Sequence, residues 1–97
     1  MPYSIVLAPE AIEDLRRLKA PHRSAVKQAI ETHLRHEPTK QSKSRIKRLR
    51  GIRRPGYRLR IGDVRVFYDV SERAVEILAI ISKSDARAWL ESIQGES

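Results

Sequence analysis

The stretch Y-R-L-R-I-G-D-V-R-V-F-Y-D-V, residues 57–70, decides the fold of this chain. Arginines alternate with apolar residues on both sides of Gly62-Asp63, a pattern typical of a β-hairpin with one apolar and one cationic face. A two-residue turn fixes the register and predicts that Arg60 lies directly opposite Arg65. Like charges in that position cost stability. We therefore expect this hairpin to have an anionic partner.

Composition limits the classes of protein that the chain can represent. Its 97 residues fit one domain, which we expect to span residues 1–97, and 40% hydrophobic with 5% aromatic residues predict a mainly aliphatic core. The formal net charge is +8 and the pI is about 10.4. Such a balance favours polyanionic partners, either a nucleic acid or an acidic protein.

Several classes of site are excluded or disfavoured. The chain has no cysteine, which excludes disulfides, thiolate nucleophiles and cysteine-containing zinc sites. His33 and His36 have a spacing that metals can use, but no third ligand is evident, so we expect neither a metal nor a cofactor. No apolar run approaches the roughly 20 residues of a membrane span, and no signal-peptide pattern is present. We expect a cytoplasmic protein without a membrane partner.

The flanking segments predict an α+β fold with the order β-α-α-β-β-β-α. Residues 2–8 indicate a first strand, and two apolar stripes at helical spacing predict an αα-hairpin, from Pro9 to about Lys19 and from Pro21 to before Pro38. After the 57–70 hairpin come an apolar strand and a short helix from about Ser84. We expect a small antiparallel sheet, one N-terminal strand plus a three-stranded C-terminal meander, packed on the αα-hairpin.

Strict alternation along these strands assigns each side chain to one of two faces. A four-residue turn after Val70 would pair Val70 with Val75. The face toward the αα-hairpin would then hold Tyr57, Leu59, Ile61, Val64, Val66, Tyr68, Val70, Val75, Ile77, Ala79 and Ile81. The other face would hold Arg58, Arg60, Arg65, Phe67, Leu78 and Ile80. This second face is an apolar floor with three guanidinium groups at its rim.

Phosphate recognition is the chemistry that these residues support best. Guanidinium groups bind phosphate oxygens bidentately, although three arginines could also be a solvated outer face of a sheet. Residues 39–55, expected to form a loop, carry eight Lys or Arg and no acid, and they lead directly into the hairpin. Their side chains would supply mainly non-specific phosphate contacts. The candidates are Lys43, Arg45, Lys47, Arg48, Arg50, Arg53 and Arg54.

The aromatic residues have competing interpretations. Tyr57, Tyr68 and Trp89 lie on faces that predict packing in the core. Phe67 shares the face of the arginines, so its ring could stack on a base or pack beneath the C-terminal helix.

The whole arrangement resembles the RelE/ParE superfamily of toxins from bacterial toxin–antitoxin systems. The resemblance rests on K-R-L-R-G-I at residues 47–52, on the Y-R-L-R and R-V-F-Y motifs of the hairpin, on the apolar strand V-E-I-L-A-I-I and on the closing helix. It implies either a RelE-like endoribonuclease that cleaves mRNA on the ribosome or a ParE-like inhibitor of DNA gyrase. In both branches an adjacent antitoxin, here expected to be acidic, neutralises the toxin, and a toxin–antitoxin hetero-oligomer is possible.

The resemblance also implies roles for particular residues. Arg58, Arg60 and Arg65 match the positions that line the RNA pocket of RelE-like enzymes. The chain departs from the family after its last strand, where Ser82, Lys83 and Ser84 replace an Arg or His-Arg pair. Trp89 and Leu90 stand where a tyrosine is expected. Lys83 is then the candidate for moving the proton in a metal-independent cleavage, whereas the missing tyrosine and histidine favour a toxin that binds its target without cutting it.

Overall fold

The central hairpin forms with the register that its turn requires. In this computed structural model, which describes residues 2–95, strand β3 (Tyr57–Ile61) pairs antiparallel with β4 (Val64–Val70), and Arg60 lies opposite Arg65 as predicted. Gly62 adopts φ 57°, a left-handed conformation that glycine tolerates without the usual steric cost.

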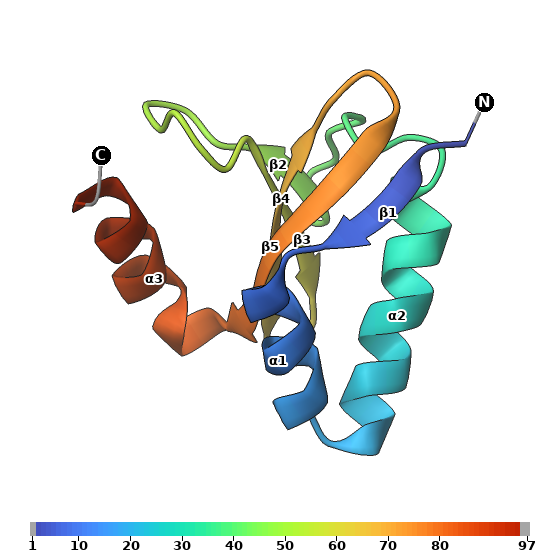
Figure 1. Ribbon diagram of the computed structural model, residues 1–97, viewed down its shortest axis with the longest axis vertical. Coiled ribbons are helices and arrows are strands. Elements are labelled where there is room, and N and C mark those ends of the chain that lie inside the picture. The colour runs from blue at the N-terminus through green and yellow to red at the C-terminus, as the bar shows by residue number, and fades with distance from the viewer. Residues whose placement is uncertain (1, 96–97) are drawn as a thin grey trace.

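The hairpin is the middle of a five-stranded mixed sheet with the order β1-β5-β4-β3-β2 (Figure 1). Strand β5 (Ala74–Ser82) follows β4 through a turn closed by the Ser71 amide, which donates to the Ala74 carbonyl at 2.9 Å, and Val70 pairs with Val75 as expected. Strand β1 (Ser4–Leu7) lies parallel to β5 at one edge. The α+β class is confirmed. The expectation of an antiparallel sheet was wrong at this edge, where β1 makes the sheet mixed, because β1 is not joined to β5 by the tight turn that would require antiparallel pairing.

A short strand in the basic segment forms the other edge of the sheet. The whole of residues 39–55 was expected to be a loop, but β2 (Ile46–Arg48) pairs antiparallel with β3. Ile46 is 4% exposed and belongs to the core, which ties the strand to the domain. The sequence did not predict β2 because a strand of three residues, two of them charged, is too short to show alternation of apolar and polar side chains. The order of elements therefore gains one strand, to β-α-α-β-β-β-β-α.

Two helices pack against one face of the sheet. Helix α1 (Pro9–Arg17) begins at a proline, and α2 (Ala20–Leu34) follows it after a short turn. Arg23 holds the two together, because its Nη2 donates to the Leu18 carbonyl at 2.8 Å and its Nε to the Leu15 carbonyl at 3.3 Å. A cation at these carbonyls also complements the dipole of α1.

The main core lies between these helices and the sheet. Its α2 side chains are Val26, Ile30 and Leu34, each at most 5% exposed, and they meet a set of fully buried strand residues. Tyr68 lies in this core as predicted, and its hydroxyl donates to the Pro38 carbonyl at 2.7 Å. Burial raises the pKa of Tyr68, so this buried hydroxyl stays protonated and able to donate.

Helix α3 (Lys83–Gly95) lies on the opposite face of the sheet, away from α1 and α2 (Figure 1). Its Trp89 ring stacks on Phe67 of β4, with ring centroids 5.0 Å apart and planes 19° from parallel. The longest helix in residues 2–95 is α2, with 15 residues, and none combines the length and apolarity needed to cross a bilayer.

The predicted faces of β5 are wrong after Ile77, because the strand contains a β-bulge. Phe67 pairs with Ala79 and Tyr68 with Ile77, so Leu78 is skipped and the alternation of β5 shifts by one residue. Ala79 and Ile81 therefore lie on the side of Phe67 and Arg65, contrary to the strict alternation. Ile80, expected on the arginine side, is 2% exposed and belongs to the main core.

Asp14 of α1 completes the edge of β5 where β1 has ended. Its Oδ2 accepts the Ile80 amide at 2.9 Å, although the carboxylate belongs to a residue only 9% exposed. Arg17 lies 3.7 Å from the other carboxylate oxygen. Asp14 thus takes the place of a strand neighbour for a buried amide that would otherwise have no partner.

We expect Asp14→Ala to lower the free energy of unfolding by about 2 kcal/mol, because it leaves the buried Ile80 amide unsatisfied. Urea denaturation measures this loss. Asp14→Asn should cost less, since the amide oxygen can still accept the bond. Glu13→Ala is the matched control, because Glu13 pairs with Arg16 at an exposed site and should change stability by less than about 1 kcal/mol. Equal losses for Asp14→Ala and Glu13→Ala would contradict the role of Asp14.

Candidate nucleic-acid interface

Four cationic side chains from three adjacent strands share one face of the sheet, which we call the arginine face: Lys47, Arg58, Arg60 and Arg65. Lys47 of β2 lies opposite Arg58 of β3, and Arg60 lies opposite Arg65 of β4. Because side chains alternate along each strand, all four project to the side away from α1 and α2. The structure thus adds Lys47 to the three arginines that the sequence had placed together.

The arginine face carries unneutralised charge. Among residues 2–95, none of its four cations forms an ion pair, and the Arg58 Nε is buried without a hydrogen-bond partner. The pKa of Arg58 lies below the usual arginine value, first because burial disfavours the charge and then because Arg65 and Arg60 repel it. A bound anion would relieve both effects, so this face is suited to phosphate groups.

Arg65 also has a structural role. It is 7% exposed, and its Nη1 donates to the Gly62 carbonyl at 2.8 Å and to the Val64 carbonyl at 3.1 Å. These bonds hold the hairpin turn. A substitution of Arg65 would therefore disturb the turn as well as the charge of the arginine face.

Lys83 lies at the turn end of the hairpin. Its backbone amide donates to the Asp63 carbonyl at 2.7 Å, which ties the start of α3 to the turn. Its exposed side chain lines a cleft of about 490 Å³ with Asp63, Ser82 and Ser84. Its amine makes no hydrogen bond or ion pair with the residues that the structure describes.

Phe67 occupies the expected face but is covered. Its ring is 1% exposed and stacks on Trp89. Contrary to the prediction of a stacking platform, the ring has no free side for a base in this structure. Phe67 instead packs beneath the C-terminal helix, which was the other interpretation of this residue.

The other cations of residues 39–55 are distributed over different surfaces. Arg48 lies on the face opposite to Lys47, with its guanidinium carbon 5.8 Å from the centroid of the Tyr57 ring. Arg45 lines a separate cleft near α2. Lys43, Arg50 and Arg53 are exposed. Sequence alone could not separate these residues, because the separation depends on the register of β2.

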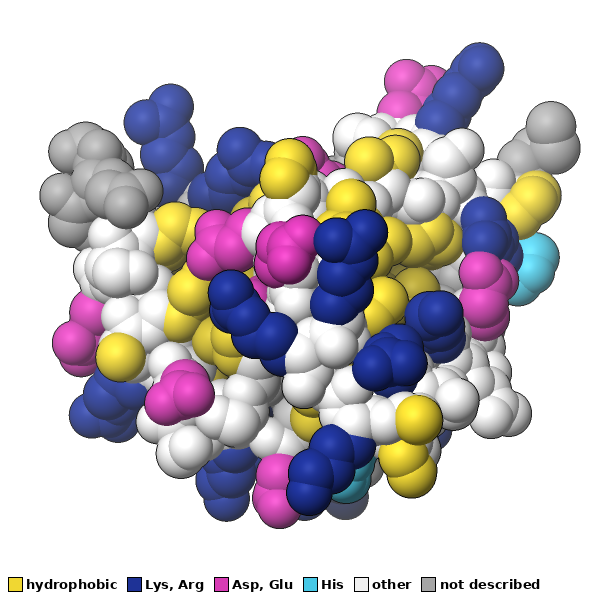
Figure 2. All heavy atoms as spheres, turned by 60° about the horizontal axis from the view of Figure 1, so that its bottom comes forward, with side chains coloured by type: hydrophobic (Ala, Val, Ile, Leu, Met, Phe, Trp, Pro, Cys, Tyr) yellow, Lys and Arg dark blue, Asp and Glu magenta, His cyan; other side chains and the backbone are white. Residues whose placement is uncertain are grey.

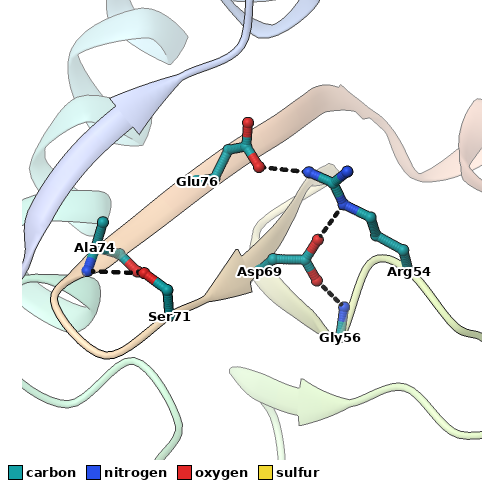
Figure 3. Close-up of polar contacts among 6 residues, drawn as sticks. All are labelled: Arg54, Gly56, Asp69, Ser71, Ala74 and Glu76. Carbon is teal, nitrogen blue, oxygen red and sulfur yellow. Dashed lines mark hydrogen bonds and ion pairs between the residues drawn. The ribbon is translucent and has the colours of Figure 1, made fainter.

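Arg54 is held by an ionic network within the protein (Figure 3). Its Nε donates to Asp69 Oδ2 at 2.6 Å and its Nη2 to Glu76, while the Gly56 amide donates to Asp69 Oδ1 at 2.6 Å. The pKa of Arg54 is raised, chiefly by the hydrogen bond to Asp69. Expected to contact phosphate, Arg54 instead anchors the end of the basic segment to β4 and β5. The signal available in the sequence was that Asp69 and Glu76 are the only acids on these two mainly apolar strands.

Another face of the molecule carries charges of both signs. Figure 2 brings the side below α1 and α2 to the front, and acidic and basic side chains are mixed there with apolar ones. Such mixed surfaces attract polyanions weakly. The unpaired cations of the arginine face are the stronger candidate for a polyanion site.

Comparison with known proteins identifies the family. Residues 5–87 match the family described as the ParE toxin of the type II toxin–antitoxin system parDE. The chain belongs to this family of toxins. No curated protein sequence gives a significant match.

Solved structures with the same fold place this toxin in the wider RelE/ParE superfamily. A RelBE2 toxin–antitoxin complex from Mycobacterium tuberculosis is similar at a TM-score of 0.70 with 26% identity, covering 84% of this chain and 99% of the other. An archaeal RelE–RelB complex from Pyrococcus horikoshii OT3 gives 0.70 and 26%, covering 86% and 97%. A RelB–RelE complex from Methanococcus jannaschii gives 0.68 and 19%, covering 87% and 96%, a likeness in fold alone.

Among residues 2–95, no group of three or more His, Cys, Asp or Glu side chains is arranged to hold a metal ion. His33 and His36 instead line the cleft of about 250 Å³ that contains Arg45, Lys40 and Glu37. The pKa of His33 is lowered, first by burial and then by the charge of Arg45. The fold therefore favours the neutral form of His33.

We expect His33 to make stability depend on pH. Between its lowered folded pKa and the unfolded value of about 6.5, the unfolded chain binds more protons, so stability falls as pH drops through this range. The loss of unfolding free energy from pH 7.5 to pH 5.5 should be smaller in His33→Gln than in the parent protein. His36→Gln is the control from the same cleft. An unchanged loss in His33→Gln would contradict the prediction.

The arginine face predicts salt-dependent binding of single-stranded oligonucleotides. Each phosphate contact on a single strand contributes about 0.7 to the slope of log K against log salt concentration. Lys47→Ala should therefore reduce this slope by about 0.7, measured by fluorescence anisotropy. Arg48→Ala, the neighbouring residue on the opposite face, should change it much less. If Lys47→Ala and Arg48→Ala reduced the slope equally, the polyanion would not bind specifically to the arginine face.

Proposed function

We propose that this chain is a RelE-like toxin, an mRNA interferase that cleaves translated mRNA, inhibits translation and arrests growth. The observation that carries the proposal is the arginine face, where Arg58, Arg60 and Arg65 converge from two paired strands without a carboxylate partner in the described chain. Three fixed guanidinium groups suit a phosphodiester in a defined position better than a flexible basic tail would.

The proposed reaction uses the RNA's own 2′-hydroxyl. The 2′-oxygen attacks the adjacent phosphorus, the bond to the 5′-oxygen breaks, and a 2′,3′-cyclic phosphate and a 5′-hydroxyl result. Arg58, Arg60 and Arg65 stabilise the charge that develops on the phosphorane oxygens. Because arginine stays protonated, it is a poor base. Lys83 is the proposed proton shuttle, which gives a proton to the leaving 5′-oxygen and recovers one from the 2′-hydroxyl. The ribosome supplies the alignment of the mRNA.

The proposed partners follow from the charge and from the related structures. Those of M. tuberculosis, P. horikoshii and M. jannaschii are complexes of a toxin with an antitoxin. A protein with a net charge of +8 suits an acidic antitoxin. We propose a cytoplasmic toxin that is held inactive in a hetero-oligomer with its antitoxin and that otherwise acts on the ribosome and mRNA.

A ParE-like inhibitor of DNA gyrase is the second candidate. Its specific support is the family match itself, which is to the ParE toxin. The covered ring of Phe67 and the isolated amine of Lys83 also favour a toxin that binds its target without cutting RNA.

Primer extension on a message translated in a cell-free system separates the two candidates. The nuclease should produce breaks within codons only when the message is translated. Arg60→Ala should reduce the cleavage rate by roughly a hundredfold, because it removes one charge-stabilising group. Arg60 is exposed, so its substitution avoids the structural role of Arg65. Arg48→Ala should cleave like the parent protein. An intact message together with blocked gyrase supercoiling would reject the nuclease in favour of the ParE-like function.

A further inference from the structure

A cleft of about 670 Å³ lies between α3 and the end of the basic segment. Trp89 and Ile93 line it from α3, Leu78 from the bulge of β5, and Ile52 from the basic segment. This volume is within the range of ligand sites, which are typically apolar with a few polar groups. The cleft has no role in the reaction described above.

The polar groups of the cleft do not make it cationic. Arg54 is neutralised by Asp69 and Glu76, which leaves this network with an excess of one negative charge. Glu10, in the first turn of α1, also lines the cleft, and it forms no ion pair with the described residues. Arg53 is exposed at the rim. Two carboxylates disfavour an acidic protein segment here, and the net charge of the whole chain disfavours a basic one.

The cleft adjoins the arginine face through Trp89. One side of its half-buried ring covers Phe67, whose neighbour across the hairpin is Arg58. The same indole lines the cleft. An RNA strand whose phosphates lie on the arginine face would therefore have an aromatic surface within reach of one of its bases.

We propose that this cleft is a nucleobase-binding subsite, in which Trp89 stacks on one unpaired base of the RNA while Glu10 and Glu76 accept N–H donors from the edge of that base. The inference rests on the proposed function, because the RNA must first be held on the arginine face. A base is uncharged and planar, so it suits an aromatic cleft with carboxylates better than a phosphate does. Arg53 at the rim contacts the adjoining phosphate.

This chemistry selects among the bases. Guanine presents a ring N–H and an exocyclic amine side by side, which match a carboxylate, whereas uracil presents a single ring N–H between two carbonyl oxygens. The subsite therefore favours guanine over uracil. Glu10 is its specificity-determining residue, because Glu76 is already bound to Arg54.

Trp89 is the single tryptophan of the chain, so its fluorescence reports on the surroundings of this one ring, which lines the cleft. The probes are the pentanucleotides UUGUU and UUUUU. We expect UUGUU to quench the emission of Trp89 saturably and to bind about tenfold more tightly than UUUUU. Glu10→Gln should reduce that preference to about twofold or less, since the amide replaces one acceptor by a donor. Glu13→Gln, a substitution on the same helix outside the cleft, should keep the full preference.

Anisotropy of labelled pentanucleotides, measured in parallel, reports binding to the protein at any site, independently of Trp89. Binding without any change in Trp89 emission, or with equal affinity for the two sequences, would overturn the subsite and leave the nuclease proposal intact. Absence of RNA binding together with absence of mRNA cleavage would overturn both. Quenching by an acidic antitoxin peptide but not by RNA would identify the cleft as a protein-docking surface and would also reject the subsite.

Discussion

The pairing of β3 with β4 through Gly62-Asp63 is the constraint on which the rest of the structure depends. A two-residue turn leaves no freedom in register, so Arg60 must face Arg65 and Arg58 must face Phe67. The same register sends Leu59, Val66 and other apolar side chains to the core under α1 and α2. A slip of one residue would exchange the two faces. The hydrophobic core and the cationic site are therefore fixed by the same pairing.

The bulge in β5 adapts this sheet to the helices around it. Leu78 has no partner on β4, so the side chains that follow it change faces. Ile80 then points into the main core, and Leu78 lines the cleft beside α3. The Ile80 amide then meets Asp14 of α1 rather than a strand neighbour. One irregular residue thus links the packing of α1 to the shape of the surface on the other side of the sheet.

The basic segment illustrates how identical side chains acquire different roles. Lys47 joins the arginine face, Arg48 lies over Tyr57 on the other side, and Arg54 is neutralised by Asp69 and Glu76. Charge density alone describes these residues as one patch. The hydrogen bonding of β2 and the position of two acids divide them into a member of the arginine face, a residue packed on Tyr57 and an anchor.

The sequence by itself determined the α+β class, the αα-hairpin, the register of the central hairpin and the convergence of Arg58, Arg60 and Arg65, because local alternation and a two-residue turn encode them. Tertiary structure decided strand β2, the bulge after Ile77, the ionic network of Arg54 and the burial of Phe67 beneath Trp89. These features depend on contacts between residues far apart in the chain, or on a three-residue strand too short to show a period. The cleft beside α3 belongs to the same group, since it exists only where α1, the basic segment, β5 and α3 meet.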